Sequence, residues 1–301
     1  MTTYHTPVLL HESIEGLNIR PGGVYVDVTF GGGGHSSEIL RQLKAGKLLA
    51  FDQDPDASIN ILNDDRFFLC KANFRFLKNF IRYYNIELID GLLADLGVSS
   101  HHFDTAERGF TFQGNSPLDM RMNPEAKLTA RDVLNQYTEE QLCYVFKEYG
   151  EVVNARRLAF TIISQRGSTD FSTSNQFIEA IRPCIFSGTE NKYLAKVYQA
   201  LRIEVNRELE ALKALLNQCI ELIKSGGRLV VITYHSLEDR IVKNFIRTGN
   251  FEGKVIKDFF GNPIAPFRPL NNRVITPSDK EIASNSRARS AKMRIAERIE
   301  Q

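Results

Sequence analysis

The sequence predicts an α/β fold in which a mostly parallel sheet, with helices on both faces, is interrupted by a helical segment. In the first third of the chain, short apolar runs alternate with helical stretches, as in strand–helix repeats that build a parallel sheet. From residue 104 to about residue 204, strand-like runs are few. A strong strand and a helix return at 228–247. We therefore expect a sheet domain made of 1–103 and 205–301, with a mostly helical domain, 104–204, inserted into it.

The first third supplies four candidate strands. Residues 24–29 form a short β-branched run, and a helix follows at 36–43. The runs 47–52 and 88–96 are apolar and carry an acid at or near their ends, and a further short run lies at 66–70. Because the carboxyl ends of parallel strands meet at one edge of a sheet, we expect these acids to lie near one another.

The inserted segment has helical periodicity. Helices are expected at 130–134, 139–149, 152–165 and near 177–181. From 194 to 223, apolar residues recur at steps of three and four, which predicts one long helix with a single buried stripe.

The sheet resumes after this long helix. The "SGG" at 225–227 is expected to stop the helix. "RLVVITYHS" at 228–236 is typical of a buried strand, and 237–247 of a helix. The second half of the chain therefore returns to the domain that the first third began.

Composition narrows the class of protein. Apolar residues make up 43% of the chain, but no apolar run approaches the ~18 residues of a membrane span. The N-terminus lacks the pattern of a secretory signal, and the four cysteines are far apart without metal-ligand spacing. We expect a cytoplasmic protein with reduced thiols, no membrane association and no metal site.

Charge is unevenly distributed. The whole chain carries +2, whereas residues 268–301 contain eight Lys/Arg and four Asp/Glu, a balance of +4, which leaves −2 for the remainder. This basic C-terminal segment is compatible with a polyanionic partner and also with a solvated helix end. Charge alone slightly favours the solvated helix end.

Four consecutive glycines at 31–34 separate the first strand from its helix. Glycines allow sharp turns and close approach of a ligand, and four exceed what a strand-to-helix turn needs. A phosphate-binding P-loop would require a following Lys, which is absent, and the spacing of a dinucleotide-binding loop places Ser36 or Ser37 at its third glycine. The loop therefore fits neither phosphate ligand well.

Two acids indicate a different ligand. Asp52 ends the second strand, where an acid typically binds ribose hydroxyls in doubly wound sheets. Asp27 lies just before the glycine loop, where it would repel a pyrophosphate and suit a cation; alternatively it is a structural carboxylate that caps loop amides. S-adenosylmethionine has a ribose, an amino group and a sulfonium but no phosphate, so the loop and the acids together favour it over NAD. Asp95, at the end of the fourth strand, is an active-site candidate, although strand-terminal Asp is also a common turn residue.

Long strings of the sequence resemble the RsmH (MraW) family, whose members methylate the exocyclic N4 of a cytidine in the decoding region of 16S ribosomal RNA. The resemblance runs nearly end to end. It is carried by "HTPVLLHESIEGLNI" at 5–19, "VDVTFGGGGHS" at 26–36, "AFDQDPDA" at 50–57, "DLGVSSHHFDTAERGFTF" at 95–112, "SPLDMRMN" at 116–123, "QALRIEVNRELEAL" at 199–212, "GGRLVVITYHSLEDRIVKNF" at 226–245 and "SRARSAKMRIAER" at 286–298.

The resemblance implies a Rossmann-like class I methyltransferase sheet with an inserted helical domain that takes part in substrate recognition. It also implies S-adenosylmethionine as cofactor and 16S rRNA of the small ribosomal subunit as partner. The cofactor contacts that it implies are Gly33, Gly34, His35, Asp52, Phe74, Asp95 and His102. Without the resemblance, Phe74 is better explained as a core residue.

Four departures from the family pattern remove no cofactor residue, and the last two of them bear on RNA contacts. Gly32 stands where members often carry a larger residue, and His101 where proline is usual. "LAKV" at 194–197 replaces a segment usually close to Pro-Ala-Thr-Arg. "LNNRVITPS" at 270–278 replaces a more Lys-rich version.

For the reaction we expect Asp95, or the backbone carbonyls of 95–96, to accept hydrogen bonds from the amino group of the cytosine. His235 and Ser236, at the end of the fifth strand, are candidates for the base pocket, although capping of the next helix by Ser236 with Asp239 explains them equally well. Arg287 and Arg289 of the basic segment are candidates for phosphate contacts, together with Lys292 and Arg294.

Three other functions fit parts of the sequence less well. A DNA amino-methyltransferase usually carries an Asn/Asp-Pro-Pro-Tyr/Phe turn, where this chain has Asp-Leu-Gly-Val at 95–98. A non-catalytic ribosome-assembly factor would not need the intact loop and acids, and an NAD-dependent oxidoreductase is disfavoured by the loop spacing. The sequence leaves the oligomeric state open, a homodimer included.

Overall fold

The computed structural model describes residues 7–168, 170–261, 263–271 and 273–300. The chain divides into two compact units, which we name unit 1 (Met1–Gly97 with Leu209–Gln301) and unit 2 (Val98–Glu208). Unit 1 is therefore discontinuous in sequence. The boundaries expected from the sequence, 104 and 204, lie just inside the two ends of unit 2. Among the described residues, no helix combines the length and the apolar character that crossing a bilayer would require.

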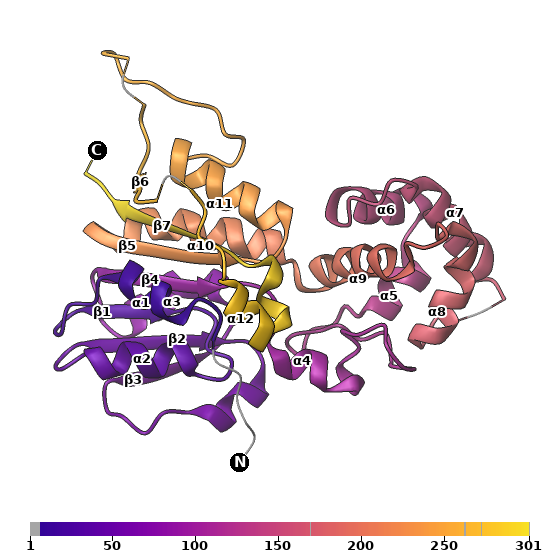
Figure 1. The fold of residues 1–301 in the computed structure, drawn as a ribbon, viewed down its shortest axis with the longest axis horizontal. Helices are drawn as coiled ribbons and strands as arrows, with labels where there is room; N and C mark the ends of the chain where they lie inside the picture. The colour runs from indigo at the N-terminus through magenta and orange to yellow at the C-terminus, as the bar shows by residue number, and fades with distance from the viewer. Residues whose placement is uncertain (1–6, 169, 262, 272, 301) are drawn as a thin grey trace. The chain divides into compact units, whose positions relative to one another are not determined.

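Unit 1 is built on a seven-stranded sheet with the order β3-β2-β1-β4-β5-β7-β6 (Figure 1). Strands β1 to β5 are parallel, and β7 is antiparallel to both of its neighbours. The order changes direction between β1 and β4, as in doubly wound sheets, so the expected Rossmann-like α/β fold is confirmed. The strands are β1 Val24–Asp27, β2 Lys47–Asp52, β3 Phe67–Lys71, β4 Ile89–Asp95, β5 Ile223–Thr233, β6 Phe267–Pro269 and β7 Lys292–Arg298.

Helices cover both faces of this sheet because successive strand residues point to opposite sides. On one face, Leu92 and Ala94 of β4 join a core with α3, α10 and α11. On the other face, Leu93 joins a core with α1 and α2. The helices of this part of the chain are α1 Leu10–Leu17, α2 Gly34–Gln42, α3 Leu77–Tyr83, α10 Glu208–Leu222, α11 Ser236–Thr248 and α12 Asp279–Ser284.

Unit 2 is helical and has its own core. Its largest fully buried side chains include Phe146, Phe171 and Phe177. Thr129, Thr138 and Thr173 begin three of its helices with capping boxes, each closed by the Asp or Gln three residues on. The helices are α4 Ser100–Asp104, α5 Ala130–Gln136, α6 Glu139–Tyr144, α7 Ala155–Gln165, α8 Ser174–Ile181 and α9 Glu190–Asn206. The expected helix 139–149 is only half α-helical, since Val145–Tyr149 forms a π-helical turn.

The single long helix expected over 194–223 is wrong. The chain forms two helices, α9 and α10, which are interrupted at Arg207, a left-handed residue with φ 50°. Apolar spacing continues through the interruption, which is why periodicity could not reveal it.

The "SGG" at 225–227 does not stop a helix, because α10 already ends at Leu222 and β5 begins at Ile223. The pairing with β4 shifts here, from Ile89 opposite Ile223 to Gly91 opposite Arg228. The extra residues form a bulge in which Gly226 has φ +74°, a conformation that glycine adopts without strain. The expected strand 228–236 consequently starts earlier and ends at Thr233.

The basic C-terminal segment is not a solvated helix end. Residues Lys292–Arg298 form β7, which lies within the sheet between β5 and β6. Lys292, Met293, Arg294 and Ile295 alternate polar and apolar side chains, as a strand with one buried face requires. Its basic residues are therefore held in fixed positions along an ordered strand.

Candidate active site

The predicted acids meet at one edge of unit 1. The register pairs Asp27 with Ala50 and Leu93, so the ends of β1, β2 and β4 lie side by side. Asp52 and Asp95 are the last residues of their strands. We call this region, the carboxyl ends of β1, β2, β4 and β5, the acid edge. It includes the point between β1 and β4 where doubly wound sheets bind their ligands.

The glycine loop crosses the acid edge between β1 and α2. Gly33 has φ +77° and precedes the first residue of α2, so its conformation favours glycine. A Cβ on Gly34 would lie 2.2 Å from Cγ of Pro7, so any side chain there would force the loop or Pro7 to move. The N–H of Gly31 donates to Asp52 Oδ2 over 2.8 Å. These glycines thus serve the loop's own turn and packing, and they leave the N-terminus of α2 beside Asp52.

Asp27 makes the contacts of a structural carboxylate. Its side chain is fully buried. Oδ1 accepts from the Thr29 N–H and hydroxyl, and Oδ2 accepts from the Ser36 hydroxyl over 2.7 Å. Burial raises the pKa of this carboxyl, although these hydrogen bonds act in the opposite direction. Asp27 therefore fastens the start of the loop to α2, in line with the alternative that it caps loop groups.

Asp52 is partly exposed and holds the other side of the loop. Oδ2 accepts from Gly31, and Oδ1 accepts from the Asp54 N–H over 2.8 Å. Each carboxylate oxygen has a second lone pair, so further donors such as ribose hydroxyls can still bind.

Asp95 is held by neighbours on three elements. Its N–H donates to Thr29 Oγ1 over 2.7 Å, and its Oδ1 accepts from the Tyr234 hydroxyl over 2.8 Å. Its Oδ2 lies 4.0 Å from Nδ1 of His35, whose Nε2 is 3.2 Å from the carbonyl oxygen of Val8. The Asp95 carboxylate is thus oriented by the hydrogen bond to its Oδ1. Its side chain is 21% exposed.

The surroundings of Asp95 raise the pKa of its carboxyl above the value in water, so the neutral form is favoured. Burial, with a smaller contribution from the negative charges of Asp27 and Glu238, raises its pKa to about 6, against the lowering effects of His35 and the Tyr234 hydroxyl. Burial lowers the pKa of His35, so this imidazole favours its neutral form. A carboxyl that titrates near neutrality at a ligand-binding edge is typical of catalytic sites.

Two other expected cofactor contacts belong to different units. Phe74 follows β3 in a short turn of unit 1, Phe74–Phe76, and packs partly buried against the α3, α10 and α11 face. His102 belongs to unit 2, where Nδ1 lies 3.0 Å from the Ser99 hydroxyl and the ring packs on Phe110 at 4.8 Å. Their roles toward a cofactor remain predictions. The side chain of His101 and residue Asn272, at two of the family departures, lie outside the described residues.

The candidates for the base pocket follow β5. His235 is the N-cap of α11, and its buried ring places Nε2 3.2 Å from Glu238 Oε1. Ser236 is exposed. The expected helix start at Leu237 with Ser236 as its cap is wrong, because α11 already begins at Ser236 and His235 is its N-cap. Glu238 accepts from the Tyr234 N–H, and Asp239 forms an ion pair with Arg294. The start of α11 is therefore closed one residue earlier than predicted.

Arg287 and Arg289 are exposed on a tight turn, Ser286–Ser290, just before β7. Lys292 of β7 pairs with Thr233, the last residue of β5, so this turn lies near the acid edge.

Two residues at the acid edge were missed by sequence reasoning, Thr29 and Tyr234. Thr29 joins Asp27 to the backbone of Asp95, and Tyr234 orients the Asp95 side chain. Tyr234 directly follows the last residue of β5, and a polar-tipped aromatic at a strand end was the available signal.

A family model described as the MraW methylase family matches residues 2–299. The chain belongs to the MraW methylase family. The region of the match includes the whole acid edge.

Curated relatives match the chain over almost its entire length. One from Bacteroides thetaiotaomicron, named ribosomal RNA small subunit methyltransferase H, is 58% identical and covers 98% of both chains. Another with this name, from Flavobacterium johnsoniae, is 53% identical and covers 99% of this chain and 100% of its own. A solved rRNA methylase from Streptococcus thermophilus covers 98% of this chain at 11% identity with a TM-score of 0.45. The fold assignment of this MraW methylase rests on the strand order of unit 1 and not on this weak structural match.

Proposed function

We propose that the protein transfers the methyl group of S-adenosylmethionine to N4 of a cytidine in the decoding region of 16S rRNA. Family membership and relatives named as small-subunit rRNA methyltransferases support the general activity. The observation that carries the chemistry is the Asp95 carboxylate, oriented by Tyr234 over 2.8 Å at the end of β4. An oriented acceptor at this edge suits an exocyclic amine, because such an amine has hydrogens to donate.

The acid edge fits S-adenosylmethionine by its donors and acceptors. Asp52 can accept from ribose hydroxyls, and Phe74 offers an aromatic surface for the adenine. Gly33, Gly34 and His35 form the N-terminal end of α2, whose partial positive charge suits the carboxylate of the amino-acid part. Asp27 would then act through the shape of the loop rather than by contact.

When bound, S-adenosylmethionine supplies a methyl carbon activated by its sulfonium. The protein's task is to align the amine and to exclude water. The Asp95 carboxylate accepts a hydrogen bond from the N4 amino group, and this orientation directs the nitrogen lone pair toward the methyl group. N4 becomes acidic only after it gains the methyl group, and a carboxyl with a pKa of about 6 can then take up its proton.

The RNA must present its cytosine unstacked to reach such a site. We assign phosphate contacts to Arg287 and Arg289, the base pocket to His235 and Ser236, and part of the substrate selection to unit 2. His102, seven residues after Asp95 in sequence, is the cofactor residue that unit 2 would contribute.

Asp95→Ala tests the assignment of Asp95. We expect methyl transfer to small ribosomal subunits to fall at least ~100-fold, because an oriented acid–base group typically contributes that much. The affinity for S-adenosylmethionine, measured by calorimetry, should change much less. Unchanged turnover would remove Asp95 from the mechanism. Cofactor binding by the wild type without turnover on subunits would instead favour a non-catalytic assembly factor.

A further inference from the structure

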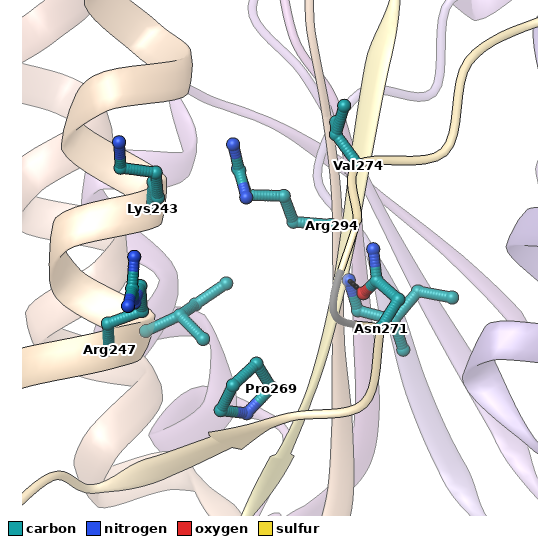
Figure 2. A pocket seen from close by; sticks show the side chains of 8 residues that line it. Lys243, Arg247, Pro269, Asn271, Val274 and Arg294 are labelled. Carbon is teal, nitrogen blue, oxygen red and sulfur yellow. Dashed lines mark hydrogen bonds between the residues drawn. The ribbon is translucent and has the colours of Figure 1, made fainter.

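Unit 1 contains a second candidate site away from the glycine loop, a cavity of about 370 Å³ between α11, β6 and β7 (Figure 2). We propose that this cavity binds a backbone phosphate of the RNA substrate. The proposal rests on the proposed function, because it takes the substrate to be RNA. The cavity is lined by Lys243, Ile246, Arg247, Pro269, Asn271, Val274, Arg294 and Ile295.

Three cationic side chains line this cavity. Lys243 and Arg247 lie one turn apart on α11, and Arg294 extends toward them from β7 (Figure 2). Arg294 is paired, since its Nε lies 2.7 Å from Asp239 Oδ1. Lys243 and Arg247 form no ion pair with any residue that the structure describes. Of the three cations that line the cavity, only Arg294 is thus paired with an acid among the described residues.

Two of the three basic residues of α11, Lys243 and Arg247, lie on the same side of the helix and line the cavity. Arg247 lies in the last turn, where a positive charge interacts favourably with the helix dipole. Lys243 lies one turn earlier. Asp239 stands four residues before it, but the ion pairs of Asp239 are with Lys292 and Arg294. Lys243 and Arg247 are like charges four residues apart on a helix, and such charges repel each other. An anion between them would remove this repulsion.

The cavity has room for a phosphate group, and its rim is held by a hydrogen bond. Its volume lies within the range of small-ligand sites, and guanidinium groups can bind phosphate through two parallel hydrogen bonds. Asn271 helps to hold the rim, because its Oδ1 accepts from the Ile295 N–H over 3.0 Å. Arg294 is only 19% exposed, so its charge is screened less than that of a free surface side chain.

The register places the cavity within reach of an RNA strand at the acid edge. Asp95 pairs with Ile232, and Ile232 pairs with Met293, which directly precedes Arg294. Two strand spacings amount to about 10 Å across the sheet, a distance that a few nucleotides of an RNA strand can span. A cytidine at Asp95 would therefore have a phosphate a few nucleotides away at this cavity.

The test compares Lys243→Gln/Arg247→Gln with Lys44→Gln/Lys47→Gln, which removes the same charge from exposed residues. Lys47 begins β2, and three strands separate β2 from β7. The probe is a fluorescein-labelled 16S rRNA fragment containing the decoding region, titrated at several salt concentrations. We expect the first variant to bind about ten-fold more weakly and to lose about 1.4 from the salt slope, as for two contacts to a single strand.

Charge-conserving Lys243→Arg/Arg247→Lys should retain most of the affinity. A cavity variant that matches the Lys44/Lys47 control would overturn the proposal. Binding of free phosphate in place of RNA would also overturn it. In that case inorganic phosphate would raise the Tm of the wild type but not of the cavity variant, and RNA binding would be the same for both. Failure of the proposed function is seen separately, as wild-type protein that does not methylate small subunits.

Discussion

At the scale of single residues, the acid edge depends on a hydrogen bond between the ends of two neighbouring strands. The Tyr234 hydroxyl orients the Asp95 carboxylate and lowers its pKa, while burial raises that pKa to about 6 overall. The ends of strands that carry Asp52 and Asp95 could be predicted, because apolar runs mark them. The Tyr234 contact could not, because it exists only once β4 and β5 are paired.

Tyr234→Phe should move the acid limb of the pH profile of kcat to higher pH by about one unit. Asp95 must be ionised to accept the amine hydrogen, and loss of the hydroxyl removes an interaction that favours the ionised form. The measurement is methyl transfer to small subunits across that limb. Tyr83→Phe, at an exposed tyrosine of α3, is the control. A limb at the wild-type position would show that Tyr234 does not tune Asp95.

At the scale of elements, the start of α2 is fixed by packing as well as by any ligand. The sequence indicated a loop that needs several glycines, but not which contact requires each one. Gly33 needs its positive φ, whereas Gly34 is required by Pro7, a residue far back in the sequence.

Gly34→Ala should destabilise the protein by about 1–3 kcal/mol, as overpacked sites do. Alanine improves helix propensity by ~1 kcal/mol, but a Cβ 2.2 Å from Pro7 forces the loop to move. Cofactor affinity should fall with it. Gly22→Ala is the matched control, since a Cβ there meets nothing within 4 Å. Equal urea midpoints for the two variants would contradict this account of the loop.

The elements that sequence analysis missed have physical reasons. The left-handed Arg207 interrupts a helix without disturbing the apolar spacing on either side. In β7 the alternation of Lys292, Met293, Arg294 and Ile295 was a strand signal, but its basic residues suggested a solvated segment. Once β7 is a strand, its cations acquire fixed neighbours, including Asp239 and the cavity beside α11.

At the scale of the whole molecule, strand–helix alternation was sufficient for the fold of unit 1, because a parallel sheet needs crossover helices. The acids and the glycine loop indicated a cofactor without phosphate. The RNA substrate could not be inferred from those residues, since nothing in the loop depends on the methyl acceptor. The proposal of an RNA substrate comes from the family resemblance and from the names of the relatives.

The most direct test of the central claim uses S-adenosylmethionine labelled in its methyl group and small ribosomal subunits from a strain that lacks the enzyme. After incubation with the protein, the RNA is digested and the labelled nucleoside is mapped. The account predicts N4-methylcytidine at one position in the decoding region of 16S rRNA. Label at another base, at another atom of cytidine, or in none of the RNA would contradict it.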